Sequence, residues 1–125
     1  MAEITRAVIA RVGVDLAKRV IQVHAVDAAG RRVAAKALKR DQFMNWCQQQ
    51  LPAGCVVAME ACSGAHSWAR QLKALGFEAR LIADSFVSPN RKEGKTGKND
   101  ITHAAPVCEA ASRPTMRIVP IKTAE

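Results

Sequence analysis

The sequence predicts an α/β fold built on a mixed β-sheet with helices beside it. One observation is that three extended patterns follow one another within residues 7–38, with only short polar breaks between them. A second is that the chain then alternates helical and extended patterns, as βα units do. The 125 residues suggest one domain spanning residues 1–125, and a hydrophobic content of 49% is typical of a globular protein rather than a disordered one.

The first three elements are expected to be antiparallel strands. Residues 7–15 (AVIARVGVD) are dominated by Val and Ile, which favour strands. Residues 20–27 (VIQVHAVD) alternate so that one face would be more solvated. Gly30 supplies a turn, and residues 31–38 (RRVAAKAL) can return as a third strand. These segments predict a three-stranded meander.

Helices and strands then alternate along the rest of the chain. In chain order we expect a helix over 40–51, a strand over 55–60, a helix over 63–76, a strand over 78–83, a short helix or turn over 84–92, a Gly/Lys loop over 93–99, a helix over 100–113 and an extended segment over 116–122. The order β-β-β-α-β-α-β-α is the ribonuclease-H-like arrangement, a mixed sheet flanked by helices.

The two central helices have recognisable ends and faces. Residues 40–51 place Phe43, Trp46 and Cys47 on one face, and Asp41 can cap or favour the start. Residues 63–76 have Ser63 as the expected N-cap and Gly76 as the expected stop. We expect three side chains of this second helix to face the core, namely Trp68, Leu72 and Leu75.

The chain carries a net charge of +8, from 19 Lys and Arg against 11 Asp and Glu. This excess favours nucleic acid as the first partner and an acidic membrane as the second, with a basic protein that has no such partner as the alternative. The expected phosphate-binding residues lie in two clusters, Arg31, Arg32, Lys36, Lys39 and Arg40, then Arg91, Lys92, Lys95 and Lys98. A merely solvated face is the alternative for the first cluster.

The cysteines show neither paired nor zinc-binding spacing. Cys47, Cys55, Cys62 and Cys108 lie in apolar surroundings, so we expect buried, reduced thiols. The sequence has no signal peptide and no apolar run of about 18 residues. We therefore expect a cytoplasmic protein without a membrane partner.

Acidic residues stand at the ends of predicted strands and at the start of the last helix. Asp15 ends the first strand, Glu60 ends the strand over 55–60, and Asp100 opens the helix. If the first and fourth strands are neighbours, Asp15 and Glu60 approach each other, and clustered carboxylates commonly bind a hard cation such as Mg²⁺ or Mn²⁺. The alternative for Asp15 is a strand-end aspartate that caps a turn.

A series of motifs then identifies a family resemblance over almost the whole chain. VGVDLAK, VHAVDAAG, MEACSGAHSWARQLKALG, RLIA, GKND and CEAASRPTMRIVPIKT follow one another in family order. The chain resembles the N-terminal, RuvC-like DEDD nuclease domain of bacterial insertion-sequence transposases of the bridge-RNA-guided type. The resemblance implies DNA transposition by divalent-metal-dependent cleavage and strand transfer. It also implies DNA and a structured guide RNA as partners, and it leaves a homo-oligomer open.

The same resemblance implies a ligand set. The family's first three acidic residues fall on Asp15, Glu60 and Asp100, and its fourth, an Asp, falls on His103. Imidazole is a poor Mg²⁺ ligand, although it can bind Mn²⁺. Pro106 is a further departure, since proline inside a helix costs about 3 kcal/mol.

Length is the last departure, because the family's second, serine-containing domain has no counterpart in this sequence. These features suggest a truncated copy with impaired activity. The alternative is a remnant that binds DNA or RNA without catalysis. An actin-like ATPase half shares the three-strand opening, but residues 15–18 (DLAK) lack its phosphate turn.

Several other residues suggest sites only weakly. Gly94-Lys95-Thr96 resembles part of a P-loop, but the glycine needed five residues earlier is Pro89. His24 and His66 lack ligand spacing, and we expect ordinary surface or packing roles for them. For Trp46 and Trp68 we expect core packing rather than base stacking.

Overall fold

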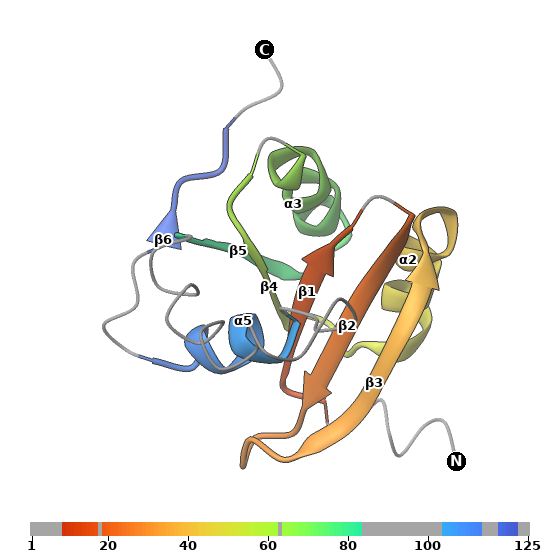
Figure 1. Ribbon diagram of the computed structural model, residues 1–125, viewed down its shortest axis with the longest axis vertical. Helices are drawn as coiled ribbons and strands as arrows, with labels where there is room; N and C mark the ends of the chain where they lie inside the picture. Colours follow the sequence, from red (N-terminus) through yellow and green to blue (C-terminus); the bar gives the residue numbers. More distant parts are fainter. Residues whose placement is uncertain (1–8, 18, 63, 84–103, 114–117, 123–125) are drawn as a thin grey trace, which may run out of the picture.

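The chain folds around a single six-stranded mixed sheet, with helices on both faces (Figure 1). The computed structural model describes residues 9–17, 19–62, 64–83, 104–113 and 118–122. The strand order in the sheet is β3-β2-β1-β4-β5-β6. An α/β fold with a mixed sheet is therefore confirmed.

The elements occupy most of the predicted ranges. The strands are β1 (Arg11–Leu16), β2 (Val20–Val26), β3 (Arg32–Lys39), β4 (Val56–Glu60), β5 (Glu78–Ile82) and β6 (Ile118–Val119), and the helices are α2 (Arg40–Gln50), α3 (Ala65–Ala74) and α5 (Ala104–Ala110). The expected short helix or turn over 84–92 and the loop over 93–99 lie outside the described residues.

The pairing of the strands confirms the meander and defines the centre of the sheet. β1 pairs antiparallel with β2, and β2 pairs antiparallel with β3. On its other side β1 pairs with β4 in parallel, and β4 pairs with β5 in parallel. The first and fourth strands are thus neighbours. The end of the chain, expected only as extended, adds β6 antiparallel to β5.

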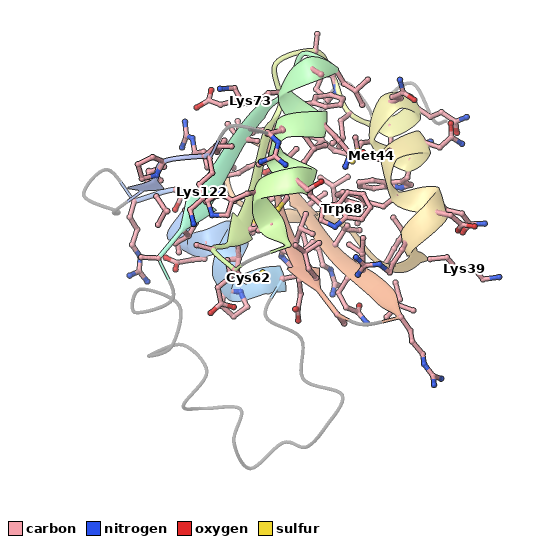
Figure 2. All side chains as sticks on the ribbon, turned by 90° about the horizontal axis from the view of Figure 1, so that it is seen from above. Lys39, Met44, Cys62, Trp68, Lys73 and Lys122 are labelled. Atoms are coloured by element: carbon pink, nitrogen blue, oxygen red, sulfur yellow. The ribbon has the colours of Figure 1, made fainter. Side chains whose placement is uncertain are left out.

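Two hydrophobic clusters place the helices on opposite faces of this sheet. Val12 and Val14 of β1 pack in the larger cluster with α2 and α3 side chains such as Phe43 and Leu72. Ala58 and Ile82 pack with side chains of α5 in the smaller one. Figure 2 shows α2 and α3 on one side of the sheet and α5 on the other.

Gly13 allows α5 to lie directly against β1. A Cβ atom on Gly13 would lie 2.5 Å from the backbone nitrogen of Cys108 and 2.6 Å from its Cβ, and it would also collide with the carbonyl oxygen of Ala104. Glycine within a strand often marks such a close backbone approach. The contact fixes the height of α5 above the sheet.

The ends of the predicted helices agree with the structure only in part. Leu75 lies one residue past the end of α3 and is 38% exposed, because the helix stops before its side chain can turn inward. Gly76 follows with a φ of 96°, which confirms it as the stop. The N-cap of α3 is Gly64, whereas the expected cap, Ser63, lies outside the described residues. Lys39 is the N-cap of α2, and Asp41 lies in the first turn, where an acid favours the helix start as expected.

The described part of the last helix contains a proline. We expected Pro106 in the second turn of a helix that begins at Asp100. The described helix α5 begins at Ala104, so Pro106 is the third residue of that described span. In the part of the chain that the structure describes, no helix is long and apolar enough to cross a membrane.

Candidate functional site

Asp15 and Glu60 stand at the carboxyl ends of two neighbouring parallel strands. The register between β1 and β4 ends with Val14 opposite Met59, and Asp15 and Glu60 are the next residues of their strands. Adjacent strands lie about 4.8 Å apart, so the two backbones are close at this point. The carboxyl ends of parallel strands are where open α/β sheets place functional groups.

Both carboxylates project from the same face of the sheet. Side chains alternate along a strand, and Val14 and Met59 belong to the cluster on the α2 and α3 face. Asp15 and Glu60 therefore project from the opposite face, the one that carries α5. Both residues are half-buried, so solvent and ligands can reach them while part of the surrounding water is displaced.

This arrangement suits a hard cation. Two carboxylates that share a site repel each other, and a bound divalent ion removes that repulsion. Carboxylate oxygens are also the ligands preferred by Mg²⁺ and Mn²⁺. The second strand end is different: Oδ1 of Asp27 accepts hydrogen bonds from the backbone N–H groups of Ala29 (3.0 Å) and Arg31 (2.9 Å). Asp27 is thus a turn residue.

The two remaining predicted ligands, Asp100 and His103, lie outside the described residues. Across the described ranges, no group of three or more His, Cys, Asp or Glu side chains is placed to hold a metal ion. The direction of α5 is nevertheless informative. Its Cys108 carbonyl lies at Arg11 and its Ala104 carbonyl at Gly13, so the helix begins on the side of β1 that leads to Asp15.

The structure separates the predicted basic residues of the first cluster. Arg31 has an 82% exposed side chain and pairs with Asp27 at 3.6 Å. Arg32 is opposite Val26, on the α5 face, whereas Lys36 is opposite Val23, on the face of α2. Arg91, Lys92, Lys95 and Lys98 lie outside the described residues.

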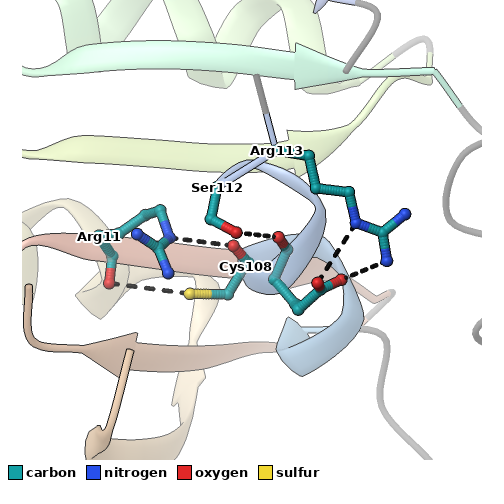
Figure 3. A network of polar contacts seen from close by, with 5 residues as sticks. Arg11, Cys108, Ser112 and Arg113 are labelled. Atoms are coloured by element: carbon teal, nitrogen blue, oxygen red, sulfur yellow. Dashed lines mark hydrogen bonds and ion pairs between the residues drawn. The ribbon is translucent and has the colours of Figure 1, made fainter. Parts of the chain in front are cut away.

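Arg11 is the residue that the sequence analysis missed. It lies two residues before Gly13 and four before Asp15, so the period of a strand places all three on one face. Its Nε donates a hydrogen bond of 3.1 Å to the carbonyl oxygen of Cys108 in α5 (Figure 3). The period-two pattern of residues 11–15 was the signal that could have found it.

Arg11 and His24 line an open pocket beside α5. The pocket has a volume of about 610 Å³ and is lined by Arg11, His24 and Val26 of the sheet, by Ala28, Ala29 and Gly30 of the β2–β3 turn, and by Ala105, Cys108, Glu109 and Ser112. We call it the Arg11 pocket. Burial, and secondarily the positive charge of Arg32, lower the pKa of His24 below its ordinary value. His24 therefore favours its neutral form in this pocket.

The tryptophans have the packing roles expected of them. Trp46 and Trp68 are partly buried against the main core. The ring of Trp68 meets that of Phe43 edge to face, with centroids 5.3 Å apart. His66 also has a structural role, since its Nδ1 accepts a 3.0 Å hydrogen bond from the backbone N–H of Lys122.

Comparison with known proteins finds relatives named as transposases. A Pseudomonas aeruginosa protein described as a "Probable family 20 transposase" is 50% identical over 117 residues, which is 94% of this chain and 33% of the relative. The transposase for insertion sequence element IS1111A of Coxiella burnetii is 41% identical over 90% of this chain and 30% of its own length. The transposase for IS1328 of Yersinia enterocolitica is 38% identical over 90% of this chain and 32% of its own.

The similarity covers nearly all of this chain but only part of each relative. The chain spans about a third of the length of the curated relatives it matches. No protein-family model matches the chain, and no solved structure does.

Proposed function

We propose that these residues form the metal-binding nuclease domain of an insertion-sequence transposase, with a ribonuclease-H-like, RuvC-like fold. The observation that carries the proposal is that Asp15 and Glu60 each follow the last paired residue of two adjacent parallel strands, on one face of the sheet. The names of the relatives supply the biological setting. Because the chain matches about a third of their length, we propose for it the metal-binding part of the reaction rather than the whole transposition.

Asp15 and Glu60 would hold Mg²⁺ or Mn²⁺ through their carboxylate oxygens, with Asp100 and His103 as the further proposed ligands. When bound, such ions activate a water or hydroxyl and stabilise the leaving oxygen of a phosphodiester. The protein's own contribution is position. β1 and β4 are held in register by the sheet, so neither carboxylate depends on a loop for its place.

His103 supports a second candidate function, a domain that binds DNA or RNA without cleaving it. The family resemblance implies an aspartate there, and replacing a carboxylate with an imidazole removes one negative charge from the proposed metal site. In that case the phosphate-binding surface would remain while turnover is lost. In either case the proposed partners are DNA and a structured guide RNA, and the proposed location is the cytoplasm. A second copy of the chain is a further candidate partner.

A cleavage assay on the full chain tests the first candidate. Supercoiled DNA would be incubated with the protein and Mn²⁺ or Mg²⁺, beside Asp15→Ala and the control Asp41→Asn, which changes an exposed acid in the first turn of α2. We expect nicking by the parent and the control but none by Asp15→Ala. Unchanged cleavage in Asp15→Ala would refute the assignment. DNA binding without any metal-dependent nicking would favour the second candidate.

A further inference from the structure

The Arg11 pocket has the charge and chemistry of an anion site. Its base is formed by β1 and β2, one wall by the β2–β3 turn and the other by α5. At about 610 Å³ it falls within the size range of small-ligand pockets, ~300–1,000 Å³. No role in the proposed metal site accounts for it, because it lies at the start of β1 whereas Asp15 lies near the end.

The guanidinium of Arg11 is held in place by a hydrogen bond from its Nε atom to α5. The Nε atom caps α5 through the Cys108 carbonyl, which fixes the plane of the group (Figure 3). The same guanidinium lies beside the Cys108 thiol, where its charge and a hydrogen bond partly offset the rise in the pKa of that thiol that burial causes. A half-buried arginine fixed at one nitrogen loses little conformational freedom when the others bind an oxyanion, and its planar fork matches phosphate geometry.

The charges around the pocket add to Arg11 rather than oppose it. Arg32 lies close enough to His24 for its charge to help lower the pKa of that imidazole. The one acidic lining residue, Glu109, is already engaged by Arg113 at both oxygens, at 2.7 and 3.2 Å (Figure 3). The carbonyl oxygens of α5 nearest the pocket also have donors, from Arg11 to Cys108 and from Ser112 to Glu109.

We propose that the Arg11 pocket binds a backbone phosphate of a nucleic acid strand, with Arg11 as the main ligand and Arg32 and His24 as secondary ones. The proposal rests on the proposed function in taking nucleic acid as the partner. It assigns a distinct second contact, because Arg11 precedes Asp15 by four residues, about 13 Å along an extended strand.

β2 supplies a polar path between this pocket and the carboxylates. Gln22 pairs with Asp15 in the register of the sheet, and His24 pairs with Gly13. Both side chains are half-buried on the α5 face, and His24 lines the Arg11 pocket. A strand whose phosphate occupies the Arg11 pocket can therefore continue past His24 and Gln22 to the metal-binding end. Contacts of this kind fix register and carry no sequence information.

The chain offers a matched pair of substitutions to test this. Arg32→Gln and Lys36→Gln each remove one positive charge from β3, but from opposite faces of the sheet. Fluorescence anisotropy would measure binding of the full chain to labelled duplex DNA and to single-stranded RNA of equal length. All samples would contain a chelator, so that cleavage and metal binding do not enter. Arg11→Gln completes the set, with circular dichroism as the folding check.

The proposal predicts a specific pattern. Arg11→Gln should weaken binding about 5- to 10-fold and lower the duplex salt slope by about 0.9, since it removes the main ligand of one phosphate. Arg32→Gln, which removes a secondary ligand of the same phosphate, should weaken binding in the same direction by a smaller factor. Lys36→Gln should change neither the binding nor the salt slope. If Arg11→Gln fails to fold, the Arg32 and Lys36 pair decides alone.

The experiment also identifies the source of the phosphate. It is the nucleic acid, duplex DNA or single-stranded RNA, whose binding is weakened by Arg11→Gln and Arg32→Gln but not by Lys36→Gln. Equal weakening of binding by Arg32→Gln and Lys36→Gln would overturn the proposal and indicate a diffuse basic surface instead. An absence of binding to either nucleic acid would also overturn the proposal. Neither result would bear on the carboxylates, since no metal is present.

Discussion

Gly13 is the single residue on which the position of α5 most depends. Replacing it with alanine would drive a methyl group into the backbone of α5, where no flexible side chain can move aside. We expect Gly13→Ala to lower the free energy of unfolding by roughly 1–3 kcal/mol or more, as overpacking does. Urea denaturation measures the change.

A second glycine provides the control for that experiment. At Gly64, the N-cap of α3, an added Cβ atom would have no other atom within 4 Å, and φ has an ordinary value of −78°. Gly64→Ala should change stability by no more than about 1 kcal/mol in either direction, since its backbone already lies in the αR region and the added methyl group would meet no other atom. Equal effects at both positions would show that α5 does not rest on Gly13.

Because of His24, we expect the free energy of unfolding to depend on pH in the mildly acidic range. Burial first, and the charge of Arg32 second, lower the pKa of His24 from 6.5, so below that pH the folded protein binds fewer protons than the unfolded chain. Its contribution to stability is complete above pH 6.5 and is lost as pH falls toward the lowered value. Measured between pH 8 and 5, the free energy of unfolding of His24→Gln should therefore fall less steeply than that of the parent. Parallel curves would contradict this.

At the scale of elements, Arg40 joins the loop after Asp15 to the helix that follows Glu60. From the start of α2 its Nη1 donates a 2.8 Å hydrogen bond to the carbonyl oxygen of Ala17, and its guanidinium lies 5.5 Å from the centre of the Trp68 ring in α3. Figure 2 shows Trp68 between α3 and α2. Arg40 therefore supports the backbone near both carboxylates.

Removal of this link should destabilise the protein measurably. Arg40→Met keeps the apolar stem but loses the hydrogen bond and the cation–π contact, at a cost of about 1–2 kcal/mol. Lys73→Met is the control, since Lys73 is an exposed cation in the last turn of α3. Thermal unfolding followed by circular dichroism compares them. A melting temperature of Arg40→Met that matches the control would refute the link.

The elements were predictable where a local pattern determines them. Alternation in residues 20–26 separates Gln22 and His24 from Ile21, Val23 and Ala25, as the structure confirms. The prediction that Leu75 faces the core was wrong, because helical spacing does not indicate the residue at which a helix ends. β6 was seen only as extended, because two residues acquire strand identity from pairing with β5 and not from their own pattern.

At the scale of the whole molecule, the cysteines report on global unfolding. Cys47, Cys55 and Cys108 are buried and free, as expected, but Cys62 is exposed and contradicts the expectation of burial (Figure 2). It follows β4 at the rim of the sheet, where an apolar sequence context does not guarantee cover. Burial raises the pKa of Cys47 to about 12 and that of Cys55 to about 11.

Thiol reactivity should therefore distinguish Cys62 from the other three cysteines. With an aromatic disulfide reagent at mildly alkaline pH, the native protein should show one fast thiol and the denatured protein four. Cys62→Ser should remove the fast phase alone. Rapid reaction of further thiols in that folded variant would show that the core opens locally.

The candidate site was predictable in part for a physical reason. A strand pattern that ends in an acid locates Asp15 and Glu60 along the chain, and an α/β order makes their strands plausible neighbours. Arg11 was missed because its importance comes from α5, a helix almost a hundred residues later that packs against it. The separation of Arg32 from Lys36 likewise depends on the shift in register between β2 and β3 near Ala25 and Val26.

Isothermal titration calorimetry with Mn²⁺ and Mg²⁺ would measure whether Asp15 and Glu60 bind a divalent metal ion. The parent would be compared with Asp15→Asn, Glu60→Gln, His103→Asp and the control Asp41→Asn. We expect that the parent and the control bind Mn²⁺, that loss of either carboxylate weakens binding by about tenfold or more, and that His103→Asp strengthens binding of Mg²⁺. Two results would contradict this metal site. One is that Asp15→Asn and Glu60→Gln bind the ions as tightly as the parent, and the other is that neither the parent nor any variant binds them.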